Sequence, residues 1–354
     1  MQKLSHQNML LIGRNWSTRG NNNDFEHFLN FFPGSISSTS KELNSFDNRF
    51  FRCVKNKTLN SCYSSLSVAL EYNAFIKFIN HDIKLVHYWF GDHDYYYGYW
   101  FKRIFGAKIV INLFFSLEEL QRRMPNKFHL QNADLITCSG KAQLEYLKQF
   151  IDKKKLAYLP LGVDTNFFTL PKNNNYRDKD LIICIGNNRR DYKILKKVYL
   201  RLKSIKPNIK LKLAGSEPGK SFFTDLPEVE FFPFLDDLKF RKLYRKASLL
   251  VLPLLEGGSS QTLNEALACG LPIITNKFPN LSDYTKTNAV IQHTPGDYIG
   301  MSDTCLEVLD NKKKHLEMSN AARRHILKFD FVNIKDKLIN IYSDYLDLNI
   351  VVDN

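Results

Sequence analysis

The segment from residue 248 to residue 276 constrains the fold most strongly. It begins with an apolar run at 248–255 and continues through a polar loop rich in glycine and serine. A helical stretch and a second apolar run at 272–275 follow. Short buried strands joined through a helix are the units from which parallel α/β sheets are built. We therefore expect a strand–helix–strand unit of a parallel sheet here.

The loop inside this segment concentrates groups that can bind a ligand. Glu256 precedes the loop, and Glu265 lies on the expected helix. A helix start leaves backbone N–H groups free, which suits an anion such as a diphosphate. Carboxylates, hydroxyls and amides suit sugar and ribose hydroxyls. The candidate ligand-binding residues between the two glutamates are Gly257, Gly258, Ser259, Ser260, Gln261 and Thr262.

The same alternation of apolar runs and helical stretches occurs twice along the chain. In the N-terminal half we expect strands at 9–13, 83–89, 108–115, 133–138 and 156–159, and helices at 25–31 and 139–151, the latter capped by Ser139. After a polar stretch at 171–180, strands are expected at 181–185, 210–214, 229–232, 249–252 and 272–275, with a helix at 193–203. A chain of 354 residues exceeds one ordinary core, so two domains are expected.

Several motifs resemble, in order, those of one enzyme family. They are LGVDTNFF at 161–168, the strand end before Glu256, EALACGLPII at 265–274, and Phe329–Phe331 with the amphipathic tail after it. This order is similar to that of the retaining GT-B glycosyltransferases of the family 4 or group 1 type. The resemblance covers the C-terminal half closely and the N-terminal half loosely.

The resemblance implies a fold and a domain division. The fold is α/β, of the GT-B kind, with two doubly wound Rossmann-like domains facing across a cleft. Residues 1–168 would form the acceptor-binding domain and residues 169–333 the nucleotide-sugar-binding domain. Residues 334–354 would form a helix that crosses back to the N-terminal domain.

The resemblance also implies roles for particular residues. Glu265 would hold the nucleotide ribose, and Glu256 would act in catalysis beside the donor sugar. One more residue than is usual in the family separates the two glutamates. Asn187 stands where the family has an arginine for the diphosphate, which leaves Arg189, Arg190 and Lys193 as displaced candidates. Further donor-site candidates are Phe234, beside the base, and Arg19 and Gly20 in the first loop.

The acceptor side carries a different candidate. His93 lies in a His-Asp run, VHYWFGDHDYYYG, which fits an acid–base group, a metal ligand or a plain surface feature. We expect His93 to be a catalytic residue of the acceptor site. The histidine that the family often has near Phe114 is missing from this chain.

Charge and composition restrict the partners. The formal net charge of +14 fits an anionic substrate, an anionic membrane or nucleic acid. The chain is also rich in lysine and asparagine, and such a general bias in composition would raise the charge without any specific partner. No nucleic-acid-binding motif is present, so we expect no nucleic-acid partner. The aromatic run at 95–105, with Arg122, Arg123 and Lys127 expected nearby, indicates either core packing or a peripheral contact with an anionic membrane. No apolar run is long enough for a membrane span or a secretory leader, so cytoplasmic residence is expected, with a peripheral place at the inner face of the membrane left open.

The resemblance implies a transferase of the hexosyl type. It would move a sugar from a nucleotide-sugar to a glycan or lipid-linked acceptor, with retention, in cell-surface polysaccharide or glycolipid assembly. The six scattered cysteines are expected to be free thiols, and no metal or other cofactor is expected. Two alternatives remain: a degenerate GT-B domain that binds a nucleotide-sugar or a partner without turnover, and a nucleotide-sugar epimerase.

Overall fold

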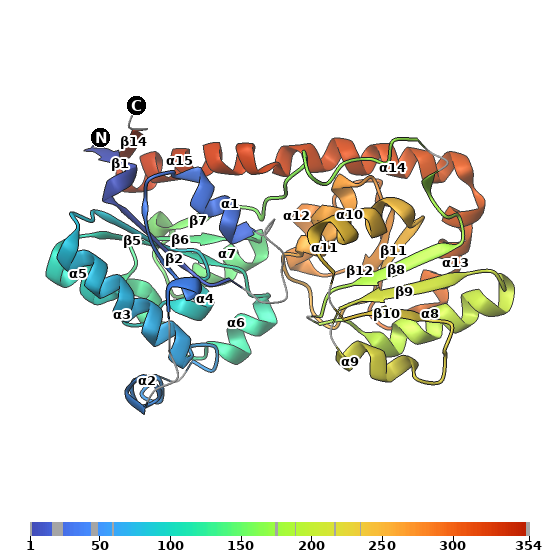
Figure 1. The fold of residues 1–354 in the computed structure, drawn as a ribbon, viewed down its shortest axis with the longest axis horizontal. Helices are drawn as coiled ribbons and strands as arrows, with labels where there is room; N and C mark the ends of the chain where they lie inside the picture. Colours follow the sequence, from blue (N-terminus) through green and yellow to red (C-terminus); the bar gives the residue numbers. More distant parts are fainter. Residues whose placement is uncertain are drawn as a thin grey trace. The chain divides into compact units, whose positions relative to one another are not determined.

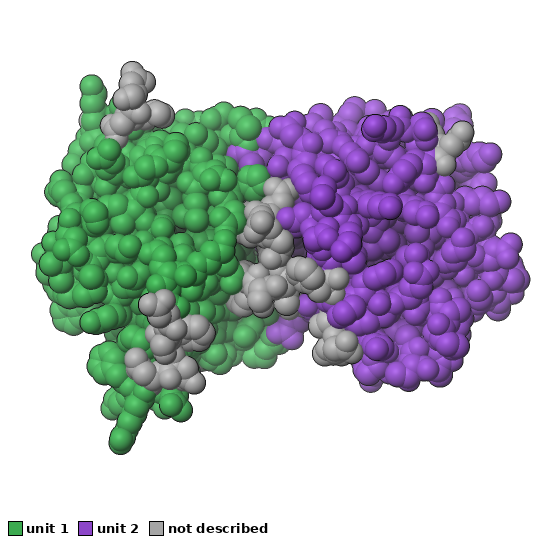
Figure 2. Space-filling model, viewed as in Figure 1, with its two compact units in different colours: residues 1–161, 332–354 green, residues 162–331 purple. Residues whose placement is uncertain are grey.

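The computed structural model describes residues 2–15, 24–43, 49–58, 60–173, 176–187, 189–215, 217–233 and 235–351. The chain divides into two compact units (Figure 2). Unit 1 contains residues 1–161 and 332–354, and unit 2 contains residues 162–331. The sequence places the corresponding boundaries after residues 168 and 333.

Unit 1 is built on a six-stranded parallel sheet with strand order β3-β2-β4-β5-β6-β7 (Figure 1). All five residues of β2 are buried, as are all four of β4, which explains why these strands are continuous apolar runs in the sequence. A separate two-stranded parallel sheet joins β1 to β14. The strands are β1 (Gln2–Ser5), β2 (Met9–Gly13), β3 (Ile36–Thr39), β4 (Leu85–Tyr88), β5 (Lys108–Leu113), β6 (Leu135–Cys138), β7 (Leu156–Tyr158) and β14 (Leu348–Val351).

Eight α-helices accompany this sheet in the described part of unit 1. They are α1 (Asp24–Phe31), α2 (Arg49–Lys55), α3 (Ser65–Asn80), α4 (Gly91–Asp94), α5 (Tyr99–Phe105), α6 (Leu117–Arg123), α7 (Lys141–Leu147) and α15 (Phe331–Leu346). The expected cap of α7 is wrong. The helix begins after Gly140 rather than Ser139, and the Gln143 side chain, not a serine hydroxyl, accepts the Gly140 N–H.

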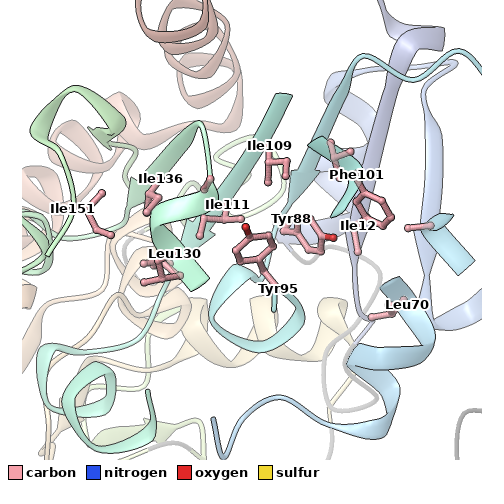
Figure 3. Close-up of a cluster of buried hydrophobic side chains, with 14 of the residues drawn as sticks. Ile12, Leu70, Tyr88, Tyr95, Phe101, Ile109, Ile111, Leu130, Ile136 and Ile151 are labelled. Carbon is pink, nitrogen blue, oxygen red and sulfur yellow. The ribbon is translucent and has the colours of Figure 1, made fainter. Parts of the chain in front are cut away.

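One core cluster of unit 1 lies between the sheet and the helices α3 and α5 (Figure 3). Strand residues such as Ile12 and Ile111 pack there against Leu70 of α3 and Phe101 of α5, and all four are buried. Tyr95, in the aromatic run before α5, is also buried in this core.

A chain of buried polar groups fixes α15 to the sheet of unit 1. The hydroxyl of Tyr342 on α15 hydrogen-bonds Nδ1 of His87 on β4, and the His87 Nε2 bonds the Asn112 side-chain oxygen on β5 at 2.9 Å. The Thr137 hydroxyl on β6 donates to the same oxygen. Burial lowers the pKa of His87 to about 3, so the ring is neutral and the network consists of uncharged hydrogen bonds.

Unit 2 repeats the architecture with a six-stranded parallel sheet of order β10-β9-β8-β11-β12-β13. Its strands are β8 (Leu181–Ile185), β9 (Lys210–Ala214), β10 (Glu230–Phe232), β11 (Leu249–Leu252), β12 (Ile273–Asn276) and β13 (Val290–His293). Its described α-helices are α8 (Tyr192–Ile205), α9 (Glu217–Lys220), α10 (Asp237–Lys246), α11 (Gln261–Ala268), α12 (Ser282–Thr285), α13 (Tyr298–Asp310) and α14 (Lys312–Ile326).

The expected fold class, two Rossmann-like parallel-sheet domains, is confirmed. Among the described helices none is both long and apolar enough to cross a membrane. The six cysteines are free, and all but Cys53 are buried.

Candidate functional site

The candidate site of unit 2 is built on two neighbouring strands, β8 and β11. These strands are paired in parallel, so the loops at their carboxyl ends emerge side by side. Backbone hydrogen bonds tie the loops together, from Leu255 N–H to Arg189 oxygen and from Asp191 N–H to Pro253 oxygen, both at 2.9 Å. The candidates from the Gly186 loop and from the Glu256 loop therefore lie on one fixed surface.

Glu256 stands where β11 passes into the glycine-serine loop, and it pairs with an arginine. Arg189 Nε lies 3.3 Å from Oε2 of Glu256, and the glutamate side chain is only 15% exposed. Arg189 adopts a left-handed backbone conformation with φ of 57°, which is uncommon for a residue other than glycine. The sequence predicts Arg189 as a diphosphate ligand, whereas the structure places its guanidinium on the candidate catalytic carboxylate.

Glu265 lies on α11 and accepts a hydrogen bond from a buried tyrosine. The Tyr244 hydroxyl on α10 donates to Glu265 Oε2 at 2.8 Å. Burial, and then the nearby Glu265 carboxylate, raise the pKa of Tyr244 well above its usual value, so the hydroxyl stays protonated and keeps donating. The bond holds one carboxylate oxygen in place, and Glu265 remains partly exposed.

Arg190 lies beneath the turn after β8. Its Nε donates to the Ile185 oxygen at 2.8 Å, and its Nη2 lies 3.3 Å from the Thr262 hydroxyl on α11. Gly186 has φ of 97°, and a Cβ there would come within 2.3 Å of Nη2. Burial lowers the pKa of Arg190. Arg190 and Thr262, both predicted as donor-site residues, therefore lie together in the structure. Lys193, another candidate, is exposed on the first turn of α8.

The glycine-serine loop is tightly packed where it begins. A Cβ at Gly257 would lie 2.0 Å from the Phe278 Cβ, so the loop passes too close to Phe278 for any other residue. Gly258 and Ser259 are partly exposed, and Ser260 caps α11 by accepting the Leu263 N–H. Both amide atoms of Gln261 are buried and have no hydrogen-bond partner among the described residues.

Some predicted site residues fall outside the described part of the chain, namely Arg19, Gly20 and Phe234. Other residues were not found from the sequence. Tyr244 holds Glu265 by a hydrogen bond, and Phe278 packs closely against Gly257. The Asn276 side-chain oxygen accepts the Leu254 N–H at 2.6 Å, two residues before Glu256. They belong to other elements, so spacing within the Glu256 motif gave no signal for them.

The candidate acceptor residue His93 lies at the carboxyl end of the unit 1 sheet, on α4. Its neighbours Asp92 and Asp94 are buried, so the surface interpretation of the His-Asp run is wrong for them. Asp94 pairs with Arg14, and Asp92 accepts the N–H groups of Phe114 and Phe115, both at 2.8 Å. The aspartates thus anchor α4 to the ends of β2 and β5.

The His93 ring is held against Phe115, with ring centroids 4.9 Å apart. Burial, and to a smaller extent the charges of Arg14 and Arg123, lower the pKa of His93 to about 3. A ring that is neutral at physiological pH can form hydrogen bonds to an acceptor substrate, but with so low a pKa it would be a weak general base.

Asp92 gives a testable pH dependence of stability. Burial raises its pKa from 3.8 to about 7, so the folded protein binds a proton that the unfolded chain has released above pH 4. Its contribution to stability is full below pH 4 and is lost as the pH rises toward 7. Asparagine keeps an oxygen for both N–H groups and does not titrate. We expect the melting temperature of Asp92→Asn to fall less than that of wild type as the pH rises from 5 to 8.

The matched control for this experiment is Asp303→Asn, because Asp303 is an exposed aspartate in unit 2. It should follow the wild-type pH profile. Burial also raises the pKa of Glu71 to about 7. Part of the dependence of the melting temperature on pH will therefore remain in Asp92→Asn. An Asp92→Asn profile that overlays wild type would show that Asp92 is ionised in the folded protein.

A protein-family model matches the part of the chain that carries this site. Residues 166–325 match the sequence model of the family described as glycosyl transferases group 1. This segment is similar to group 1 glycosyltransferases, and we refer to it as the group 1 domain. It includes Arg189, Glu256, Glu265 and the loop between the glutamates, so the resemblance expected from the motifs is confirmed at the level of group 1.

One curated relative extends beyond the group 1 domain. The MMP alpha-(1->4)-mannosyltransferase of Mycolicibacterium hassiacum is 22% identical in an alignment of 247 residues that covers 67% of this chain. The match spans 59% of the relative's own length, less than two thirds of it.

Solved structures resemble the whole chain in fold. A glycosyltransferase of Rickettsia africae has a TM-score of 0.68 and 15% identity, covering 98% of this chain and 99% of the other. Sucrose-phosphate synthase of Thermosynechococcus elongatus has a TM-score of 0.71 and 13% identity, covering 98% and 100%. Anabaena HepE in complex with UDP gives 0.71 and 13%, covering 95% and 99%. At these identities the likeness establishes the fold alone.

Within the ranges that the structure describes, no three His, Cys, Asp or Glu side chains are grouped so that they could hold a metal ion.

Proposed function

We propose that this protein is a retaining glycosyltransferase of family 4. It transfers a sugar of the hexose type from a nucleotide-sugar to a glycan or lipid-linked acceptor. Its setting would be the assembly of cell-surface polysaccharide or glycolipid, in the cytoplasm and peripherally at the inner face of the membrane. Unit 2 binds the donor, and unit 1 binds the acceptor.

One observation carries this proposal. Within the group 1 domain, Glu256 with Arg189 and Glu265 with Tyr244 stand around one glycine-serine loop at the carboxyl ends of β8 and β11. Ligands of doubly wound sheets bind at this edge. The α11 start supplies N–H groups for a diphosphate, and the partly exposed carboxylate of Glu265 can accept ribose hydroxyls.

The chemistry follows from where the charges lie. Glu256 would stabilise positive charge that develops on the donor sugar, while Arg189 orients that carboxylate. The diphosphate leaving group would be stabilised by the α11 start and by Arg190 or Lys193. No covalent nucleophile is needed, the acceptor proton can pass to the leaving phosphate, and no metal is required in this scheme.

The relatives support a nucleotide-sugar donor. Anabaena HepE has been solved with UDP and with UDP-glucose, and the M. hassiacum relative is a mannosyltransferase. We therefore place UDP and GDP first among the nucleotides to be tested, with ADP, CMP and dTDP beside them.

The test is a thermal-shift screen of these nucleotides. A ligand that binds only the folded state raises the melting temperature, and at about a hundred times its Kd it stabilises by about 2.7 kcal/mol. We expect one nucleotide to raise the melting temperature of wild type and to leave that of Glu265→Ala unchanged. Glu307→Ala removes an exposed glutamate on α13 and should keep the shift. No shift with any nucleotide in folded wild type would contradict the donor site.

A specific observation supports one alternative. Glu256 is already paired with Arg189, and Asn187 stands in place of the family's arginine, as a degenerate domain that binds without turnover would permit. Nucleotide binding without donor hydrolysis or transfer would favour that alternative. Conversion of the donor without any acceptor would instead indicate an epimerase, and NMR of the product's anomeric proton tests retention.

A further inference from the structure

The helices α2 and α3 form a surface of unit 1 with an unusual charge pattern. Between residues 49 and 80 the basic residues are Arg49, Arg52, Lys55, Lys57 and Lys77, and the one acidic residue is Glu71. Glu71 is buried, where it accepts the N–H groups of Tyr96, Tyr97 and Gly98 and the hydroxyl of Tyr63. No acidic side chain of α2 or α3 therefore faces solvent.

Helix α2 is attached to unit 1 by one side and exposes the other. Phe51 is buried, in a cluster with Val68 and Ala69 of α3, and its ring lies 6.0 Å from that of Tyr72. The adjacent Phe50 is 62% exposed, although a phenylalanine gains free energy from burial. In Figure 1 the helix stands at the margin of unit 1, below α3.

Helix α3 continues the apolar surface. Tyr72, Ile76 and Ile79 are four and three residues apart, which places them on one side of the helix, and all three are exposed. Helix α5 packs beside α3 through Phe75 and Phe105, with ring centroids 5.8 Å apart. It exposes Trp100 and Ile104.

The cations beside these apolar groups remain available for an external anion. In the part of the chain that the structure describes, Arg49, Lys55 and Lys57 form no ion pair. The basic residues that the sequence placed beside the aromatic run lie elsewhere. Arg123 lies on α6 over Phe115, and Lys127 lies over Tyr146 and Phe150.

We propose that the α2–α3 surface, defined by Arg49, Phe50, Lys55, Lys57, Tyr72, Ile76 and Ile79, docks on a membrane that contains anionic lipid. Exposed aromatic and aliphatic side chains enter the interfacial region of a bilayer, and adjacent Arg and Lys side chains attract anionic headgroups. The positive charge favours an anionic membrane over a neutral one, and the exposed apolar side chains beside it fit the interfacial region of a bilayer. The inference rests on the proposed function in that a lipid-linked acceptor requires the enzyme to reach a membrane.

The test is sedimentation of the whole protein with vesicles. The vesicles contain phosphatidylcholine alone or phosphatidylcholine mixed with phosphatidylglycerol. We expect wild type to bind the mixed vesicles, and binding to weaken in high salt because the screening length falls from about 10 Å at 0.1 M to about 3 Å at 1 M. Arg49→Glu with Lys55→Glu should lower binding about tenfold or more.

A second variant tests the apolar part, and a third is the control. Phe50→Ser with Ile79→Ser should also lower binding, through loss of insertion rather than of charge. Leu238→Ser with Lys242→Glu changes an exposed apolar and basic pair on α10 of unit 2, and it should bind as wild type does. The nucleotide-induced thermal shift, measured on every variant, should be unchanged and so shows that each is folded.

Several outcomes would overturn the proposal. They are absence of binding by wild type, equal binding to both vesicle types, or equal loss in the α10 control. A wild-type dimer that Phe50→Ser with Ile79→Ser converts to a monomer would assign the surface to a second copy of the chain. Vesicle binding without any nucleotide shift would leave the docking surface standing and contradict the proposed transfer function alone.

Discussion

Replacing Glu256 with glutamine is expected to lower kcat for sugar transfer about a hundredfold or more. The substitution keeps the size of the side chain and removes the negative charge that would face the donor sugar. Because Glu265 and the α11 start hold the nucleotide in this scheme, nucleotide affinity should change only a few-fold. Initial rates with the donor found in the nucleotide screen, and thermal shifts with its nucleotide, measure the two effects separately.

The control for Glu256→Gln is Glu307→Gln, which should keep the wild-type kcat. Arg189→Met provides a further distinction. It removes the partner that lies 3.3 Å from Glu256 and leaves the carboxylate, so kcat should fall less than in Glu256→Gln. If Glu256→Gln transferred sugar at nearly the wild-type rate, Glu256 would serve only to hold the Arg189 turn.

The strands with the clearest signal in the sequence are the central ones, most of whose residues are buried. The strands β2, β8, β9 and β11 have the expected bounds, and in β2, β8 and β11 every residue is buried. The edge strands β3, ISST, and β13, VIQH, were missed because partial burial gives them no apolar run. The pairing of β1 with β14 joins opposite ends of the sequence, and no local pattern predicts it.

The candidate site was predictable only as far as it is local. Glu256 and Glu265 share one loop and helix, so their motif could be read directly. Their partners Arg189 and Tyr244 lie on other elements, and the contact of Arg189 depends on a backbone turn with φ of 57°. The polar stretch at 171–180 carries no motif, yet it contains Arg177, whose guanidinium binds the ends of two helices of the site.

Arg177 is expected to contribute more to the stability of unit 2 than other arginines, because it closes two helix ends at once. Its Nη1 donates to the oxygens of Tyr244, Arg245 and Ala247 at the end of α10. Its Nη2 donates to the oxygens of Cys269 and Gly270 after α11, at 2.7 and 2.9 Å. The last carbonyls of a helix lack intrahelical partners, and a cation there also complements the helix dipole.

Arg177→Met should therefore lower the free energy of unfolding by about 3 kcal/mol or more, since it leaves buried carbonyl groups without donors. Burial lowers the pKa of Arg177 to about 10, so the guanidinium is still charged at neutral pH and the effect should be present there. Chemical denaturation followed by circular dichroism measures the total loss. Hydrogen exchange of peptides from α10 and α11 shows where it occurs.

Two further variants make the Arg177 prediction specific. Arg201→Met removes a guanidinium that pairs with Asp303 on the surface, and it should cost about 1 kcal/mol or less. Arg177→Lys should lie between the two, because one ammonium cannot reach both helix ends as a planar guanidinium does. Faster exchange in α11 would also loosen Glu265, so Arg177→Met should weaken nucleotide binding without touching the ligand. If exchange in α10 and α11 stayed at the wild-type rate, the two helix ends would not depend on Arg177.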